Sequence, residues 1–283
     1  MHRIAHLSDV HLLDPRRDPR SRRAGARYRL ATKLVSLGRS LDPRLRARKL
    51  ARALAAAKAS LASHVVISGD LTELGDDAEF EHFAEILEDA ALDPDAVTIV
   101  PGNHDAYTTA GGWRRALEGP LRRFAATSAG HAGKVVDRGP VAFLPIDTSC
   151  YQSLVRAGGE FSRDAAKAIE ARLGDPALRD KAVVLVLHHS PLGQDRPRWM
   201  RWVDGLRGER QVVDLLHRHP RLSVLHGHLH RVVDRILSGR EATPTRVFGA
   251  PAVCDDADDP GEFRPKVRLY EVTGAALASV GLI

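Results

Sequence analysis

Val65-Val66-Ile67-Ser68-Gly69-Asp70 is a short, mostly β-branched run that stops at a glycine and a carboxylate. Such a run is typical of a buried strand, and Gly69 breaks it so that Asp70 follows the carboxyl end of that strand. Open α/β sheets bind their ligands at this end. A single Asp at such a place is ordinarily a turn residue or a cap, so this run alone predicts a strand and no chemistry.

Four further segments have the same form, in which an apolar strand signal ends in Asp, Asn or His. They are Arg3–His11, Val97–Asp105, Val183–His189 and Leu222–His230. Taken singly, each ending is explained by a polar turn. Taken together, five strand ends would deliver metal-ligating side chains to one edge of a sheet, which packing alone does not explain.

Seven side chains at these ends are candidate ligands. They are the carboxylates of Asp9 and Asp70, the imidazoles of His11, His188, His228 and His230, and the amide oxygen of Asn103. Nitrogen and oxygen ligands without a thiolate suit Mn²⁺, Fe²⁺ or Zn²⁺, and seven ligands are more than one ion needs. Two ions ~3.5–4 Å apart that share a carboxylate clamp a phosphoryl group and make hydroxide available near neutral pH. The pattern therefore favours chemistry on an anionic phosphate ester.

The composition limits the class of protein. A chain of 283 residues can bury a full core, and we expect one domain over residues 1–283. The net charge of +6 comes from a basic insert at about residues 14–52, which has fourteen Arg or Lys against three Asp. Cys150 and Cys254 are too far apart for a zinc-finger spacing or a disulfide framework. There is no apolar run of ~18 residues and no signal-peptide pattern. We therefore expect a cytoplasmic protein, with peripheral attachment to a membrane as the alternative.

Helical patterns alternate with the strand signals. A leucine every three or four residues over 28–41, among basic residues, predicts a short basic amphipathic helix. Further helices are expected after Asp42-Pro43, from residue 76, over 113–124, after Ser162 and around 212–216, with a loop over 191–208. Strand pairs dominate the later part of the chain. We therefore expect an α/β fold of two packed sheets flanked by helices rather than a doubly wound sheet.

Five blocks resemble the calcineurin-like metallophosphoesterases in sequence and in order. They are Asp9-Val10-His11, Gly69-Asp70, Gly102-Asn103-His104-Asp105, His188 and Gly227-His228-Leu229-His230. The resemblance implies a four-layer αββα sandwich of two mixed β-sheets, with the site at the strand ends. It implies one metal ion on Asp9, His11, Asp70 and His230, and a second on Asn103, His188 and His228, with Asp70 shared. It also implies that His104 is the catalytic acid beside the leaving group, with Asp105 available to orient or charge it.

The block His188-His189-Ser190-Pro191 is most similar to bacterial class III cyclic-nucleotide phosphodiesterases. By that similarity His188 is the ligand and His189 a contact to the substrate. The reaction implied is hydrolysis of a phosphodiester by hydroxide held between two divalent ions, Mn²⁺ or Fe²⁺/Fe³⁺, with Zn²⁺ as an alternative. Arg196 and Arg198 would then bind phosphate, and the neighbouring Trp199 and Trp202 either line the substrate cleft or pack into the core.

The basic insert leaves the substrate and partners open. It is either a solvated surface, or a surface that binds an anionic membrane or an acidic substrate. Nucleic acid is an unlikely partner because only Tyr28 in the insert offers a ring on which a base could stack. The insert resembles the basic helical additions of UDP-diacylglucosamine pyrophosphatases, so a pyrophosphatase at a membrane surface is the second hypothesis. A non-catalytic scaffold is the third, although the complete ligand set argues against it. The acidic residues 255–259 are expected to form a solvated loop, and the sequence does not indicate an oligomeric state.

Overall fold

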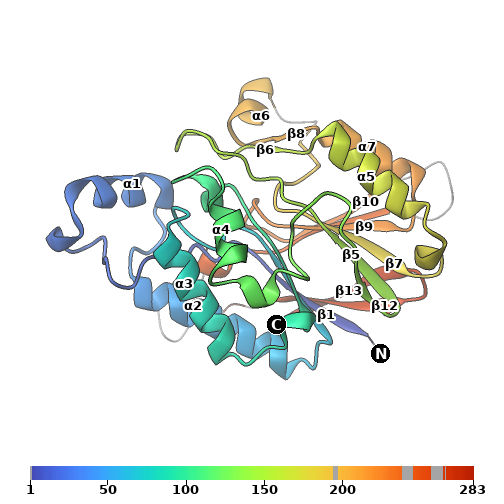
Figure 1. Cartoon of the computed structure of the whole chain (residues 1–283), viewed down its shortest axis with the longest axis horizontal. Coiled ribbons are helices and arrows are strands. Elements are labelled where there is room, and N and C mark those ends of the chain that lie inside the picture. The colour runs from blue at the N-terminus through green and yellow to red at the C-terminus, as the bar shows by residue number, and fades with distance from the viewer. Residues whose placement is uncertain (1, 194–196, 238–244, 256–263, 265) are drawn as a thin grey trace.

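The structure is a computed structural model that describes residues 2–193, 197–237, 245–255, 264 and 266–283 (Figure 1). Its first large sheet has the order β13 (Ala276–Leu282), β12 (Arg268–Thr273), β1 (Arg3–Leu7), β2 (His64–Ser68), β3 (Val97–Val100). Strands β1, β2 and β3 are parallel, and β12 is antiparallel to both β1 and β13. The strand expected before Gly69 is therefore β2, which is buried along its whole length between two parallel neighbours.

The second large sheet is also mixed. Its order is β10 (Val233–Leu237), β11 (Thr245–Gly249), β9 (Leu222–His226), β7 (Ala182–Val186), β5 (Val141–Pro145), β4 (Val136–Arg138). The four inner strands are parallel, and β10 and β4 are antiparallel edge strands. A separate two-stranded sheet pairs β6 (Gly159–Glu160) with β8 (Leu206–Arg207).

Helices cover the outer faces of the two sheets (Figure 1). On the first sheet lie α2 (Pro43–Ala59), α3 (Asp77–Asp89) and α4 (Gly112–Glu118), and on the second lie α5 (Arg163–Leu173) and α7 (Glu209–Arg218). One core cluster joins residues of both sheets, such as Ile67 and Val184, and another joins the second sheet to α5 and α7. The predicted arrangement of two mixed sheets flanked by helices is confirmed. Among the described residues, no helix combines the length and apolarity that crossing a bilayer requires.

Local sequence signals explain where the helices of the first sheet begin. The Asp42 carboxylate accepts from the amides of Arg44 and Leu45 and caps α2, with Pro43 in its first turn. Asp76 and Glu79 form a capping box at the start of α3. Residues 43–52 of the predicted basic insert therefore belong to a helix of the main core, where Leu50 is fully buried.

Two predictions for the segments after β3 are wrong. The helix expected over 113–124 ends at Glu118, and a separate 3-10 turn follows at Arg122–Phe124, because Gly119-Pro120 interrupts the helical pattern. The loop expected over 191–208 contains a short helix, α6 (Arg198–Asp204), followed by β8. Trp199 and Trp202 on α6 are 67% and 61% exposed, so neither packs into the core.

The basic amphipathic helix forms as α1 (Ala26–Ser36), which projects from the body of the molecule in Figure 1. It ends before the predicted Leu41 because Leu37 and Gly38 have φ of 47° and 89°, in the left-handed region. Its buried side packs Tyr28 and Val35 against residues of the first sheet's loops. The leucine stripe of the sequence lies on the opposite side and is exposed to solvent.

Candidate metal centre

The seven predicted ligands follow the carboxyl ends of five strands, and six of them, the Asp and His side chains, lie close together. Asp9 and His11 follow β1, Asp70 follows β2, Asn103 follows β3, His188 follows β7, and His228 and His230 follow β9. Ligand atoms lie within 4.8 Å of one another in the groups Asp9/His11/His230, Asp9/Asp70/His188, His11/Asp70/His104 and His188/His189/His228. These groups share members, so both sheets contribute to one cluster.

The backbone at these strand ends is strained. Eight non-glycine residues of the described chain have a positive φ. Five of them are candidate ligands, Asp9, His11, Asp70, His228 and His230, with φ between 51° and 68°. Such a conformation costs of order 1–3 kcal/mol per residue and persists where the surroundings impose it, which is typical of functional sites.

Two glycines allow the close approach of Asp70 and His188. A Cβ atom at Gly102 would lie 2.1 Å from Oδ1 of Asp70, and one at Gly69 would lie 2.5 Å from Nδ1 of His188. Gly69 also has a φ of 96°, which other residues rarely adopt. The glycines that mark strand ends in the sequence are therefore needed for the geometry of the cluster.

Asp70 lies between the two halves of the cluster. Its Oδ1 accepts a hydrogen bond of 2.9 Å from the backbone N–H of His104. Its Oδ2 lies 3.2 Å from Nε2 of His188 and 3.6 Å from Nε2 of His11. One carboxylate oxygen thus faces imidazoles from both sheets, which is the position that a bridging ligand requires.

Several buried donor atoms of the candidate ligands have no hydrogen-bond partner among the described residues. They include Nε2 of His11, Nε2 of His188 and Oδ1 of Asn103. Buried polar atoms are rarely left unpaired, since each costs about 1–3 kcal/mol. Divalent cations would satisfy all three atoms, so the residues present fit a metal centre.

Contacts with the protein fix a second polar atom in three of the candidate ligands. Nδ1 of His188 lies 2.7 Å from the Ser68 carbonyl, and Nε2 of His228 lies 2.9 Å from the Asp204 carbonyl. The Asn103 amide donates to the Tyr107 hydroxyl at 2.9 Å. Contacts of this kind select the tautomer and orientation of metal-binding side chains.

Two imidazoles carry protons that balance the buried carboxylates. Burial opposes protonation of His230, but the Asp9 carboxylate and a hydrogen bond to Asp255 outweigh it and raise the pKa of His230 to about 10. Asp70 and Asp9 likewise overcome burial and raise the pKa of His188 to about 9. These imidazolium groups hold the pKa values of Asp9 and Asp70 well below their usual range, although burial acts in the opposite direction.

His104 lies beside the cluster, but Asp105 does not orient it as predicted. Nδ1 of His104 is 2.8 Å from the Glu73 carbonyl, and its ring meets that of His11 edge-on with centroids 4.3 Å apart. The Asp105 carboxylate accepts from the backbone of Leu71, Thr72 and Gly102 instead. Asp105 therefore joins the loops after β2 and β3 through their backbone amides.

The residues predicted to contact the substrate do not all lie at the cluster. His189 lies in the cluster, where Nδ1 contacts the Thr148 hydroxyl at 2.8 Å and Nε2 has no hydrogen-bond partner among the described residues. In the pair His188 and His189, it is His188 whose Nε2 lies 3.2 Å from Oδ2 of Asp70. That His188 is the metal ligand of the two stays a prediction. Arg198 lies on α6, outside the cluster and beside a separate cavity. Arg196 lies outside the described residues.

The sequence analysis missed two acidic side chains that support the cluster. Asp255, predicted to lie in a solvated loop, contacts Nδ1 of His230 at 2.7 Å; residues 256–259 lie outside the described chain. Glu73 is fully buried, with Oε2 3.4 Å from Nδ1 of His11. Glu73 follows Asp70 by three residues in the same strand-end loop. This position in the sequence could have indicated that Glu73 lies near the cluster.

Known proteins match both the sequence and the fold. The family model for calcineurin-like phosphoesterases matches residues 2–232, which include all five blocks. The structure of a dimetal phosphatase from Danio rerio aligns over 100% of this chain and 99% of its own, with a TM-score of 0.66 and 15% identity. The structure of TT1561 from Thermus thermophilus aligns over 99% of this chain and 98% of its own, with a TM-score of 0.56 and 14% identity. No curated protein matches the chain in sequence.

Metal loading is expected to release protons. A ligating imidazole must be neutral, whereas pKa values of about 9 for His188 and about 10 for His230 keep both protonated at pH 7. Loading should expel about two protons at pH 7 from these imidazoles, in addition to the proton that a bound water loses as it becomes hydroxide, and metal affinity should rise with pH up to about 10. Isothermal titration in buffers of different ionisation enthalpy measures this release, and His188→Asn should reduce it by about one proton. Proton uptake, or no exchange, contradicts the assignment.

Proposed function

The chain belongs to the calcineurin-like phosphoesterase family, and we propose that it hydrolyses phosphodiesters with two divalent metal ions. The observation that carries the proposal is the cluster at the strand ends, in which buried donor atoms converge without hydrogen-bond partners among the described residues. One ion would be held by Asp9, His11, Asp70 and His230, and the other by Asp70, Asn103, His188 and His228. Bound divalent ions would neutralise charge on a phosphoryl group and make hydroxide available near neutral pH.

The charges of the cluster favour an anionic phosphate ester. Two divalent ions, the carboxylates of Asp9 and Asp70 and one hydroxide have a formal balance of about +1. Burial lowers the pKa values of the further imidazoles His104 and His189, so neither is expected to add a positive charge near neutral pH. This balance would attract the single negative charge of a phosphodiester and the up to two charges of a phosphomonoester alike, so the choice of a diester rests on the resemblance of the block at His188 to class III phosphodiesterases.

His104 would serve the leaving group. Its contact to the Glu73 carbonyl fixes the ring through Nδ1 and leaves Nε2 to meet a departing oxygen. Protonated His104 would transfer a proton to an alkoxide through this atom. Because burial lowers the pKa of His104, the protonated form gains population as the pH falls.

A substrate panel tests the proposed function. Mn²⁺-loaded protein should turn over bis(p-nitrophenyl) phosphate with a kcat/KM at least about tenfold above that for p-nitrophenyl phosphate. Asp70→Asn should abolish both activities, and Asp180→Asn, an exposed carboxylate, serves as the matched control. The panel includes cyclic nucleotides, since the class III resemblance suggests them. Preference for the monoester contradicts diester specificity, and metal binding without any turnover supports the scaffold hypothesis.

His104→Ala should reduce turnover according to the leaving group. For a diester with a poor alkoxide leaving group we expect kcat to fall by about 10²–10⁴, the usual contribution of general acid catalysis. For a p-nitrophenyl diester, which needs little protonation, the fall should be below about tenfold. Metal content, measured on the same samples, should stay unchanged. Equal losses on both esters would exclude the acid role.

A second candidate is hydrolysis of a pyrophosphate-linked lipid at an anionic membrane surface. The observation that favours it is the outer side of α1, where Leu30, Leu34 and Leu37 are 71%, 54% and 83% exposed. Arg27 and Lys33 lie on the same helix. A helix with exposed leucines among cations is typical of binding to anionic bilayers.

The inner side of α1 connects this surface to the cluster. Tyr28 packs in one group with Leu74 and Tyr107, and the Tyr107 hydroxyl accepts the hydrogen bond from Asn103. The helix that would bind a bilayer is therefore packed on the loops that carry the candidate metal centre.

Replacing the three exposed leucines tests the membrane candidate. Leu30→Ser/Leu34→Ser/Leu37→Ser should lower co-sedimentation with vesicles of anionic phospholipid by about tenfold, because the apolar contact is lost while the cations remain. Leu61→Ser, at another leucine that is 85% exposed, should bind as wild type. Wild-type binding by the triple variant, or activity indifferent to lipid, would rule this candidate out.

A further inference from the structure

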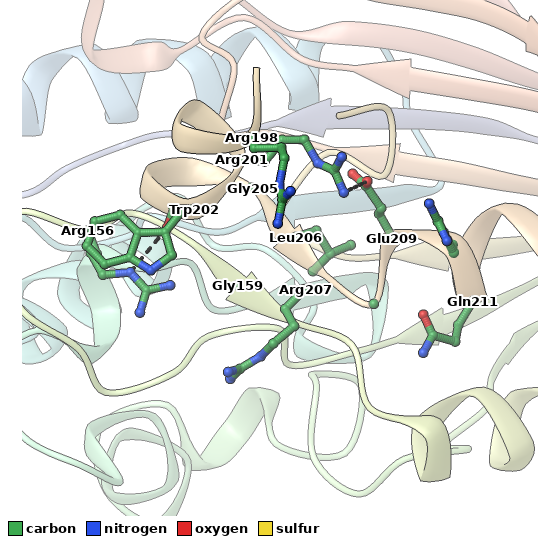
Figure 2. Close-up of a pocket in the computed structure, with 12 residues that line it drawn as sticks. Arg156, Gly159, Arg198, Arg201, Trp202, Gly205, Leu206, Arg207, Glu209 and Gln211 are labelled. Atoms are coloured by element: carbon green, nitrogen blue, oxygen red, sulfur yellow. Dashed lines mark hydrogen bonds and ion pairs between the residues drawn. The ribbon is translucent and has the colours of Figure 1, made fainter. Parts of the chain in front are cut away.

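An arginine-rich cavity of about 720 Å³ lies outside the metal cluster (Figure 2). Its walls are the residues around β6 and β8, the helix α6 and the start of α7. Five arginines line it, Arg156, Arg198, Arg201, Arg207 and Arg210, against one carboxylate, Glu209. The volume is typical of a site for a small molecule, and the charge would favour an anion.

Three of these arginines have partners within the structure. Arg201 pairs with Glu209 at 3.0 Å, and Arg207 pairs with Glu160. Arg156 donates to the Trp202 carbonyl at 3.2 Å, with its guanidinium 4.7 Å from the centroid of the indole ring. Figure 2 shows the Arg156–Trp202 pair at one side of the cavity and the Arg201–Glu209 pair toward the other.

The remaining two arginines supply positive charge that the cavity does not balance. Among the described residues, neither Arg198 nor Arg210 has an ion pair or a hydrogen bond to a carboxylate. Exposed arginines are commonly solvated, but here two lie in the same concavity as three paired ones. A guanidinium binds phosphate oxygens through two parallel N–H donors, which makes arginine the usual partner of phosphate groups.

The wall of the cavity is also the wall of the metal cluster. Asp204, at the end of α6, receives the hydrogen bond from Nε2 of His228. Gly159 lies against His189, since a Cβ atom there would be 2.3 Å from its Nδ1. The Arg156 carbonyl accepts a hydrogen bond of 3.0 Å from Tyr107, the partner of Asn103. The cavity and the cluster are thus bordered by the same segments of the chain.

We propose that the cavity binds a second phosphate group, remote from the bond that is cleaved, through Arg198 and Arg210. The inference rests on the proposed phosphodiesterase function and names the substrate class as diesters that carry a further phosphate. The same chemistry would also bind free inorganic phosphate. The experiment has two arms, which distinguish binding of the substrate's own phosphate from binding of free phosphate.

The first arm compares two substrates that differ in one phosphate. Thymidine 5′-(p-nitrophenyl phosphate) and its 3′-phosphorylated form release the same chromophore from the same diester. Wild-type enzyme should prefer the 3′-phosphorylated form, mainly through KM. In Arg198→Gln/Arg210→Gln the ratio of kcat/KM for the two substrates should fall by about tenfold, because charge-assisted hydrogen bonds are lost. Arg179→Gln removes a charge before β7, at the opposite end of that strand, and should keep the wild-type ratio.

The second arm adds inorganic phosphate and needs no turnover. Binding in the cavity should change tryptophan fluorescence, since Trp202 lines it, and the change should be lost in Arg198→Gln/Arg210→Gln. Arginine-dependent fluorescence without substrate preference assigns the cavity to free phosphate. The proposal is overturned if substrate preference and fluorescence are both independent of these arginines. Inactivity on both diesters with an intact fluorescence response would instead overturn the proposed function alone.

Discussion

The structure depends on the burial of Asp70 between its two sheets. Only 2% of this residue is exposed, and an isolated carboxylate in such a place would cost several kcal/mol. The chain compensates with the His104 amide on one oxygen and the imidazoles of His188 and His11 near the other. Because these partners come from different strands, the sheets have to converge for the carboxylate to be tolerated. Fold and candidate site are therefore consequences of the same requirement.

A second buried carboxylate connects the basic segment to the cluster. Glu73 is fully buried and accepts from Arg39 and Ser36, and it also pairs with Arg46. Arg46 in turn donates to the carbonyl of His11 at 2.6 Å. Part of the positive charge that the sequence presents as a surface insert thus balances an acid beside the candidate ligands. The exposed leucines and the cations of α1 take no part in balancing Glu73 and could contact a partner.

The sequence predicted most of the fold because its signals are local. Strand periodicity and the polar residues at strand ends indicated the six clustered Asp and His side chains, and Asp42 and Asp76 marked the starts of α2 and α3. What it missed depends on contacts between distant segments. Whether Asp255 is solvated or bound to His230, and which loop Asp105 holds, is decided only when the sheets meet. The outward direction of the leucine stripe has the same origin, since periodicity does not say which side a partner covers.

If one carboxylate bridges two ions, electron paramagnetic resonance of Mn²⁺-loaded protein shows it most directly. Two Mn²⁺ ions that share Asp70 should give an exchange-coupled spectrum at a stoichiometry of about two ions per chain, and Asp70→Asn should remove the coupling. A spectrum of isolated, uncoupled Mn²⁺ in wild-type protein, or failure to retain any ion, would contradict the account.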